Sequence, residues 1–460
     1  MWTYITALLT LPLGISATPF RQGHSPTAHV KNGTYEGVYS PEYNQDFFLG
    51  VPFAQAPIDD LRFRLPQSVN ATWEGARDAR KYSLLCVGYG LDQTFYNQSE
   101  GLYLNIVRPA GYDQAKLPRY YLSFIVEQSV KIGKPIIGIS INDRLSLWGF
   151  LYSSEVIGEG ITNLGLRDQR LALHWVQENI AAFGGDPGGK VTIFGEYAGA
   201  ASVGFQIQCL REVPFLTLNA TYDAIGGSFA PTIDGDFVRT YGSQQLRNSQ
   251  FVKVPIITGA NSDEGASMSF TGINTTEDFR ATLASFPPAS FQDAILKAYP
   301  DDLSVNVGAS LGDQRPAAPY GAQFRRSASF WGDYYFIASR RETAKTWAEH
   351  GIPAYAYGFN AIGVGHYKEV GFMFNNLKGV GYRPDIRPFR GKGQNYVDLA
   401  DLMSSTWASF IHDLDPNNYT GRDRGIPDWP RYDVLEPRDF IFDANGIALI
   451  NDHAAGVLHR

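Results

Sequence analysis

The feature that most constrains the fold of this chain is a short turn between an apolar stretch and a run of small residues. Residues 190–194 read KVTIF, residues 195–199 read GEYAG, and residues 200–203 read AASV. A glycine on each side of the turn indicates a bend too tight to accept a Cβ at either flank. A strand, G-x-x-x-G and a helix in this order predict a sharp strand-to-helix turn that presents its central side chain.

The rest of the chain alternates between strand-like and helix-like patterns. Short apolar runs bounded by Gly, Pro or polar residues predict strands, and apolar residues at helical spacing predict helices. Strands are expected at 47–53, 135–141, 190–194, 254–260 and 352–359, and helices at 164–183 and 397–413. This alternation predicts an α/β fold in which helices cover both faces of a mainly parallel sheet.

Composition excludes several classes of protein. Of 460 residues, 44% are hydrophobic and 18% are charged, which is typical of a folded chain rather than a disordered one. The net charge of −7 argues against general binding to nucleic acid. Two cysteines exclude a disulfide scaffold and a cysteine-rich metal site. We expect no metal and no cofactor.

The N-terminal segment resembles a secretory leader. Residues 2–17, WTYITALLTLPLGISA, are apolar and uncharged. The run is short for a membrane-spanning helix and fits the apolar part of a leader, with cleavage after Ser16, although no Lys or Arg precedes it. We therefore expect a signal peptide over 1–17, one domain over 18–460, secretion, and no integral membrane segment. The alternative for residues 2–17 is a buried N-terminal strand.

Glycosylation motifs agree with secretion. N-x-S/T acceptor sequences occur along the whole chain, and each one alone arises easily by chance. The acceptor residues are Asn32, Asn70, Asn97, Asn219, Asn274 and Asn418.

Long blocks of the sequence resemble the type-B carboxylesterase/lipase family, which includes the cholinesterases and the fungal secreted lipases. The resemblance covers nearly the whole chain, and the blocks occur in the family's order. They are FLGVPFAQAPIDDLRFRLPQ (48–67), LYLNIVRPAG (102–111), KPIIGISINDRLSLWGFL (134–151), the stretch from NLGLRDQR to EYAGAASV (163–203), FVKVPIITGANSDEG (251–265) and GVGHYKEVGFMFNN (363–376).

The resemblance implies an α/β-hydrolase fold and a catalytic triad in the chain order nucleophile, acid, histidine. The acid matches Glu264 and the histidine matches His366. In such a triad the histidine takes the proton of the nucleophile, and the acid orients and stabilises the histidine. By itself Glu264 could be an acid at a helix start, and His366 an ordinary buried or loop histidine. The family also implies a small-molecule or lipid ester as substrate.

The chain departs from the family at the nucleophile. Tyr197 occupies the centre of the turn, where the family has serine. A phenol has a pKa of about 10, and its oxygen lies several ångströms further from Cα than a serine oxygen. The ring would also fill the space that the acyl group needs. The N–H of Ala198 remains available as a donor to an oxyanion.

Two family segments are also missing. Residues 116–118, KLP, lead directly into 119–122, RYYL, so the strand and the Gly-rich oxyanion loop that the family has there are absent. Residues 200–208 likewise meet 209–214, CLREVP, without the expected strand and helix. We therefore expect a narrowed or rearranged sheet, or a substitute strand from residues 120–126. The family partners of Cys86 and Cys209 are missing too, and two free buried thiols are expected in preference to a bridge between them.

The sequence therefore predicts a carboxylic-ester hydrolase by family, a pseudoenzyme in which activity is weak or absent. Two alternatives stay open. One is a non-catalytic, cholinesterase-like binding protein, and the other is a truncated product of a faulty gene model.

Overall fold

The structure is a computed structural model, and it forms two compact units. It describes residues 6–10, 25–86, 98–99, 101–109, 121–196, 199–200, 202, 231–284, 289–304, 314–361 and 365–452. The first unit contains the chain up to Val252 together with Ser405–Thr420, and the second contains Lys253–Ser404 and the chain from Gly421 onward. The prediction of one domain after residue 17 stays a prediction.

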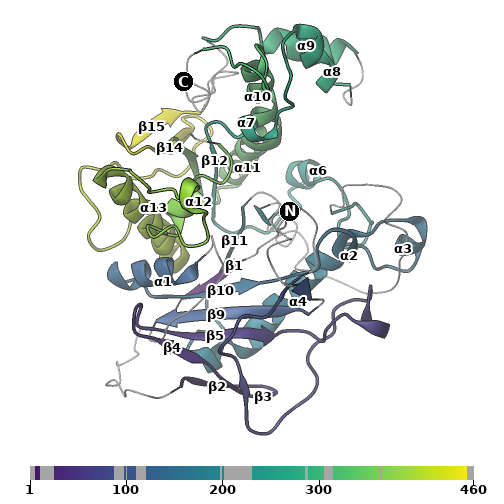
Figure 1. The fold of residues 1–460 in the computed structure, drawn as a ribbon, viewed down its shortest axis with the longest axis vertical. Helices are drawn as coiled ribbons and strands as arrows, with labels where there is room; N and C mark the ends of the chain where they lie inside the picture. The colour runs from purple at the N-terminus through teal and green to yellow at the C-terminus, as the bar shows by residue number, and fades with distance from the viewer. Residues whose placement is uncertain are drawn as a thin grey trace. The chain divides into compact units, whose positions relative to one another are not determined.

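The first unit is built on a six-stranded sheet with the spatial order β11-β1-β10-β9-β5-β4 (Figure 1). Its strands are β1 (Thr6–Thr10), β4 (Val38–Ser40), β5 (Gln45–Pro52), β9 (Tyr103–Pro109), β10 (Ile136–Ile141) and β11 (Val191–Phe194). Each strand described in this sheet pairs antiparallel to its neighbours. A segment from the start of the chain therefore lies between two strands that follow it by more than a hundred residues.

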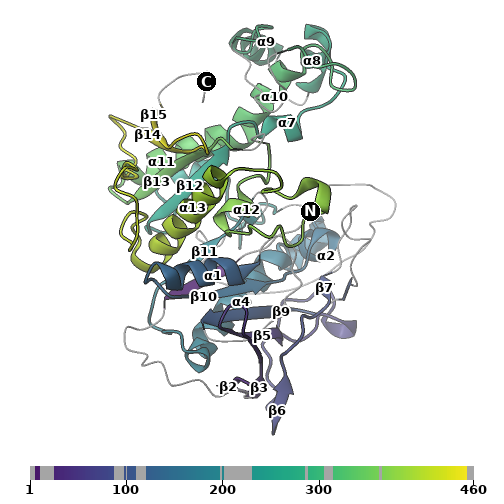
Figure 2. The same ribbon diagram turned by 60° about the vertical axis from the view of Figure 1, so that its left-hand side comes forward.

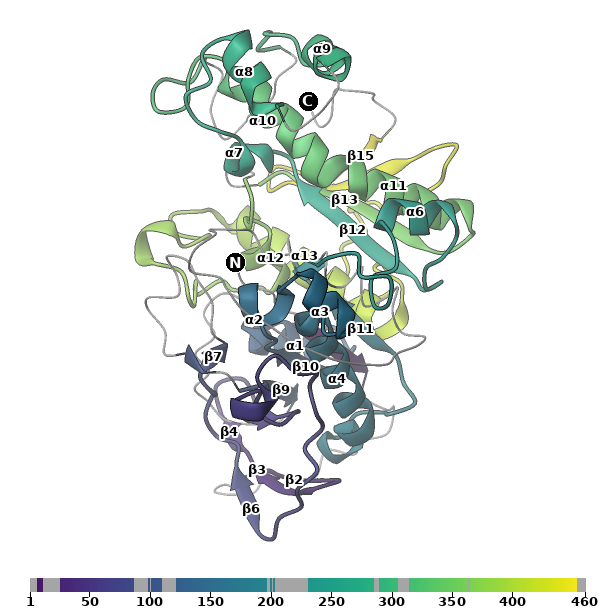
Figure 3. The ribbon, with the colours of Figure 1, turned by 90° about the vertical axis from the view of Figure 1, so that its right-hand side faces the viewer.

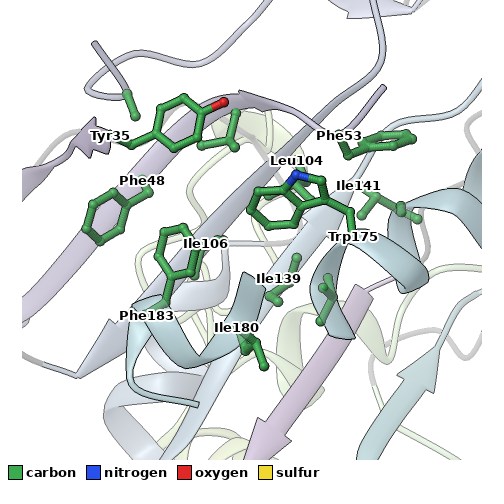
Figure 4. Packing of buried hydrophobic residues seen from close by; sticks show 14 of the residues in the cluster. Tyr35, Phe48, Phe53, Leu104, Ile106, Ile139, Ile141, Trp175, Ile180 and Phe183 are labelled. Atoms are coloured by element: carbon green, nitrogen blue, oxygen red, sulfur yellow. The ribbon is translucent and has the colours of Figure 1, made fainter. Parts of the chain in front are cut away.

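Helices cover both faces of this sheet. Side chains along β10 alternate between the faces, so β10 contacts a helix on each side. Ile137 and Ile139 pack with Trp175 of helix α4 (Leu164–Asn179) in the main hydrophobic cluster (Figure 4). Gly138 faces the other way, and a Cβ there would lie 3.2 Å from Leu122 Cβ of helix α1 (Leu122–Lys131). Glycine thus lets α1 lie close against β10 (Figure 2).

Smaller elements complete the first unit. Strands β2, β3 and β6 form a three-stranded sheet, and β7 and β8 form a pair. Three short helices and two turns of 3₁₀ helix are also present in the described residues. Their bounds are β2 (Thr27–Val30), β3 (Gly33–Glu36), β6 (Ala76–Asp78), β7 (Leu85–Cys86), β8 (Gln98–Ser99), α2 (Ser146–Phe150), α3 (Ser154–Gly158), α6 (Gly242–Arg247) and the 3₁₀ turns Asp59–Leu61 and, after α4, Ile180–Phe183.

The second unit has a four-stranded sheet whose spatial order follows the chain, β12-β13-β14-β15. The strands are β12 (Ile256–Asn261), β13 (Ala354–Phe359), β14 (Arg438–Phe442) and β15 (Ala448–Asn451). The first three run parallel, and β15 is antiparallel to β14. Helix α11 (Ala338–Glu349) packs on β12 and β13 (Figure 3), which is the parallel arrangement that alternating strands and helices predict.

The remaining helices described in the second unit lie along the chain between these strands. They are α7 (Gly265–Met268), α8 (Thr276–Thr282), α9 (Ala289–Ala298), α10 (Phe324–Gly332), a π-helical turn (Asp333–Ile337), α12 (Val370–Met373), a 3₁₀ turn (Pro384–Ile386) and α13 (Gln394–Asp413). Helix α13 contributes residues to both units, since the division falls after Ser404.

The strands and helices predicted from the sequence are confirmed. The mainly parallel arrangement holds for β12, β13 and β14, but it is wrong for the six-stranded sheet, in which each described strand pair is antiparallel. The prediction of a substitute strand at 120–126 is wrong, because residues 122–131 form helix α1. Residues 122–126 are all buried, and a buried run of this length fits a helix as well as a strand. Residues 6–10 form strand β1 between β10 and β11, and a strand in this segment was the alternative to a leader. Among the described helices, none is long and apolar enough to cross a membrane.

Candidate active site

The turn after β11 has the tight geometry that its glycines predict. A Cβ on Gly195 would lie 2.3 Å from the carbonyl carbon of Gly199, so only glycine fits there. The N–H of Gly199 donates to the carbonyl of Glu196 at 2.9 Å and closes the turn. Tyr197 and Ala198, the predicted nucleophile position and oxyanion donor, lie outside the described residues.

Glu264 lies just after β12, where the chain turns into helix α7. Its side chain is held from β12 itself, because the backbone N–H of Asn261 donates to Glu264 Oε1 at 2.9 Å. The next residue, Gly265, packs directly on α10: a Cβ at this position would lie 1.8 Å from the carbonyl oxygen of Ala328. The glycine therefore allows the close approach that fixes the direction of the Glu264 side chain.

His366 follows β13, the parallel neighbour of β12, and meets Glu264 there. His366 Nδ1 lies 2.7 Å from Glu264 Oε2, and the two side chains are 5% and 6% exposed. The ring of Phe336 packs on the imidazole with a centroid distance of 5.3 Å. Tyr367 has φ +68°, a left-handed conformation that is rare for a large side chain and that occurs often at functional sites.

This pair can act as a histidine base oriented by a carboxylate. With Nδ1–H donating to Glu264, the other ring nitrogen of His366, Nε2, is the one that can accept a proton from a hydroxyl group. The carboxylate also stabilises the imidazolium that forms. The structure thus brings together the predicted acid and the predicted histidine from segments about a hundred residues apart.

Two further residues of this site were not predicted from the sequence. Asn261 Nδ2 donates to the carbonyl oxygen of Gly365 at 3.2 Å and to Glu369 Oε2 at 2.6 Å, so it ties the His366 loop to the end of β12. Burial and the neighbouring Glu264 carboxylate raise the pKa of Glu369 to about 7. Glu369 lies three residues after His366, at the start of helix α12, and this short spacing could have indicated that it belongs to the site.

The glycosylation acceptors differ in their surroundings. Asn70, Asn274 and Asn418 are exposed, whereas Asn97 and Asn219 lie outside the described residues. Asn32 is half-buried, and its Nδ2 donates to the carbonyl oxygens of Val69 and Ala71 at 2.8 and 3.4 Å. Because a glycan needs an exposed side chain, the half-buried Asn32 is the least suited of the four described acceptors.

We next considered the cysteines and possible metal ligands of the described residues. Cys86 is free and buried, as predicted, and burial raises the pKa of its thiol. Cys209 lies outside the described residues. In the part of the chain that the structure describes, no group of three or more His, Cys, Asp or Glu side chains could hold a metal ion.

Comparison with known proteins points to one family. The model of the carboxylesterase family matches residues 24–208 and 205–442. Secreted lipase 1 of Botryotinia fuckeliana is 29% identical over 552 residues, covering 94% of this chain and 88% of that protein. Lipase 4 of Diutina rugosa is 28% identical over 522 residues, covering 89% and 90%. Both alignments are longer than this chain, so both relatives contain segments that it lacks.

The fold is shared with solved structures. EstA of Aspergillus niger superposes with a TM-score of 0.75 at 21% identity, covering 94% of this chain and 96% of that one. At this identity the likeness shows the α/β-hydrolase fold alone, and it confirms the fold predicted from the sequence.

Proposed function

The chain belongs to the carboxylesterase family, and on that premise we propose that it is a carboxylic-ester hydrolase by descent whose own turnover is weak or absent. The observation that carries the proposal is a contrast between a retained acid–histidine pair and a substituted nucleophile position in the family motif. The hydrogen bond between Glu264 and His366 has the geometry of a working acid–base pair, at 2.7 Å. The nucleophile position of the family motif, however, carries Tyr197 in place of serine.

The retained pair performs two steps in an intact relative. There, the histidine that corresponds to His366 removes the proton of the nucleophile through Nε2 as that oxygen attacks the ester carbonyl. It then returns the proton to the leaving alcohol. Glu264 holds the imidazole in the tautomer in which Nε2 is the proton acceptor. In this chain the same pair has no serine hydroxyl to act on.

Tyrosine is a poor replacement at a turn of this shape. The family has serine at this position, whose hydroxyl oxygen is bonded directly to Cβ, whereas the phenol oxygen of tyrosine lies at the far side of a ring. With a pKa of about 10, the phenol is also almost fully protonated at neutral pH. A phenol at this position is therefore a weak nucleophile.

Oxyanion stabilisation is the second deficit. The sequence passes from 116–118 to 119–122 without the Gly-rich loop, which leaves the Ala198 N–H as the donor next to the nucleophile position. Losing one such donor costs about a hundred- to a thousandfold in kcat. The two deficits act on one transition state, so their effects do not simply multiply.

The proposed substrate class is a small-molecule or lipid ester, and the proposed location is outside the cell. Relatives named as secreted lipases support both proposals. Residues 1–17 serve as the leader, and the exposed Asn70, Asn274 and Asn418 are the preferred glycan acceptors.

The test is ester hydrolysis by Tyr197→Ser and by the double variant Tyr197→Ser with His366→Ala. Tyr197→Ser should gain less than about tenfold over the unmodified chain, because the oxyanion loop is still missing. The double variant should lose whatever was gained, because the serine would then lack its base. Turnover by Tyr197→Ser at the level of an intact relative, or a gain that survives His366→Ala, would contradict the proposal.

A further inference from the structure

Strand β1 is the sole strand partner of β11 in the described residues. Leu8 stands opposite Gly138 of β10 on one side and opposite Thr192 of β11 on the other. Strand β11 lies at the edge of the six-stranded order, with β1 as its neighbour. The two flanking strands are therefore parallel to each other and are joined through a third strand that is antiparallel to both.

Strand β10 is paired along both edges, with β1 on one side and β9 on the other. All six residues of β10 are buried. Backbone N–H and C=O groups of a buried strand are almost always paired, because unpaired ones are unfavourable away from water. Between β10 and β11 the first unit therefore has a position that requires an extended chain.

The sequence of residues 6–10, TALLT, suits that position. It contains no charge, no Gly and no Pro, and Pro12 follows shortly after. An uncharged run without Gly or Pro suits a strand that pairs along both edges, and a proline cannot donate to a ladder. The same apolar, uncharged character is what made this segment resemble a leader.

We propose that the space between β10 and β11 is a strand-binding slot whose ligand is an extended, uncharged apolar peptide, and that residues 6–10 are its occupant as long as they remain attached. Removal of residues 1–17 as a leader opens the slot. This inference is independent of ester hydrolysis, and it draws on the proposed function only for the leader.

The consequence reaches the candidate active site. Strand β11 ends at Phe194 and leads directly into the turn that begins at Gly195. With β1 gone, β11 loses its strand partner in the described sheet, and the turn loses the support that holds it at the sheet edge. Processing of the leader would thus loosen the segment that carries Tyr197.

Hydrogen exchange of the backbone amides in 136–141 and 191–194 tests the proposal in the full chain. Leu8→Pro removes one ladder donor in β1, and it should make these amides exchange at least about tenfold faster than in the unmodified chain. Ser16→Pro is the matched control, since it introduces the same residue outside 6–10, and it should leave the exchange unchanged. Equal exchange in the two proline variants would overturn the proposal.

A second measurement uses the chain that begins at residue 18. Its amides in 191–194 should exchange rapidly, and a synthetic peptide of residues 2–16 with a lysine tail for solubility should slow them, whereas the same peptide with Leu8→Pro should not. Slow exchange in the truncated chain without peptide, or the same effect of both peptides, would contradict a strand-binding slot. Neither readout depends on ester turnover, so failure here and failure of the proposed hydrolase are distinguishable.

Discussion

The two units of the molecule place candidate site residues at strand ends in different ways. In the second unit β12, β13 and β14 run parallel in chain order, and Glu264 and His366 follow two adjacent strands and meet at 2.7 Å. In the first unit the strand before the turn at Gly195 is held by a segment from the start of the chain. Where the family blocks are intact, local sequence positions the site, and where they are interrupted a distant segment completes the sheet.

The two units also differ in how closely neighbouring atoms approach a glycine. At Gly265 in the second unit a Cβ would collide with backbone, 1.8 Å from the carbonyl oxygen of Ala328. At Gly138 in the first unit it would meet side-chain atoms of Leu122 and Val126 at 3.2 Å. Side chains can shift by a few tenths of an ångström, but the backbone of a packed helix cannot do so cheaply.

The largest expected effect is that of Gly265→Ala. This variant should lower the free energy of unfolding by about 3 kcal/mol or more, because α7 must move away from α10. Gly138→Ala should lower it by about 1 kcal/mol or less. Urea unfolding followed by circular dichroism measures both.

Gly158→Ala is the control for these two variants, since no atom lies within 4 Å of a Cβ at that position. It should leave stability within about 0.5 kcal/mol of the unmodified chain. Equal losses for Gly265→Ala and Gly138→Ala would break the contrast between a rigid second unit and a more adaptable first one.

A smaller effect is expected at Asn261, which ties the end of β12 to the His366 loop. Asn261→Ala removes the donor to Gly365 and Glu369, and it should lower the free energy of unfolding by about 1–3 kcal/mol. Hydrogen exchange of the amides in 365–370 should accelerate, since the loop loses this anchor.

Asn360→Ala provides the comparison for Asn261→Ala. Asn360 Nδ2 donates to Asp443 Oδ2 at 2.8 Å and has no hydrogen bond to the His366 loop among those described. This variant should lower stability without changing exchange in 365–370. Acceleration of the same amides in both variants would show that Asn261 acts through general stability.

The smallest effect concerns pH and Glu369. Its pKa is raised from 4.5 to about 7 by burial and by Glu264, so the folded chain binds more protons than the unfolded chain between these values. The contribution of Glu369 to stability therefore falls as pH rises through that window. Glu369→Gln cannot ionise, and because the residue is only partly buried we expect it to gain about 1 kcal/mol over the unmodified chain at about pH 8 and little at about pH 4.

Thermal melts of both proteins across this range measure the difference. A gain of the same size at both ends of the range would mean that the substitution acts through packing. A loss at high pH would show that Glu369 is ionised without penalty in the folded chain.

The sequence predicted the second unit better than the first, for a physical reason. The strand at 254–260, the strand at 352–359 and the motifs after them are local patterns, and parallel neighbours bring their carboxyl ends to one edge. Asn261 and Glu369 escaped notice because a hydrogen bond between an amide and a carboxylate leaves no periodic signature. The placement of residues 6–10 in the sheet is a pairing over more than a hundred residues, and an apolar run alone cannot distinguish a leader from a buried strand.

The same limit explains the error at residues 120–126. A run of apolar and aromatic residues fits a strand or a buried helix equally well when it is short. In the structure, residues 122–131 form helix α1. Strand β1, from the start of the chain, lies between β10 and β11.

The most direct test of the central claim is hydrolysis of p-nitrophenyl butyrate by the purified, unmodified chain and by Tyr197→Phe. If Tyr197 blocks the site and the oxyanion loop is missing, the unmodified chain should be at least ~10³-fold slower than an intact family member, and Tyr197→Phe should not lower the rate further. Near-normal turnover that Tyr197→Phe abolishes would contradict this account and make Tyr197 a working nucleophile.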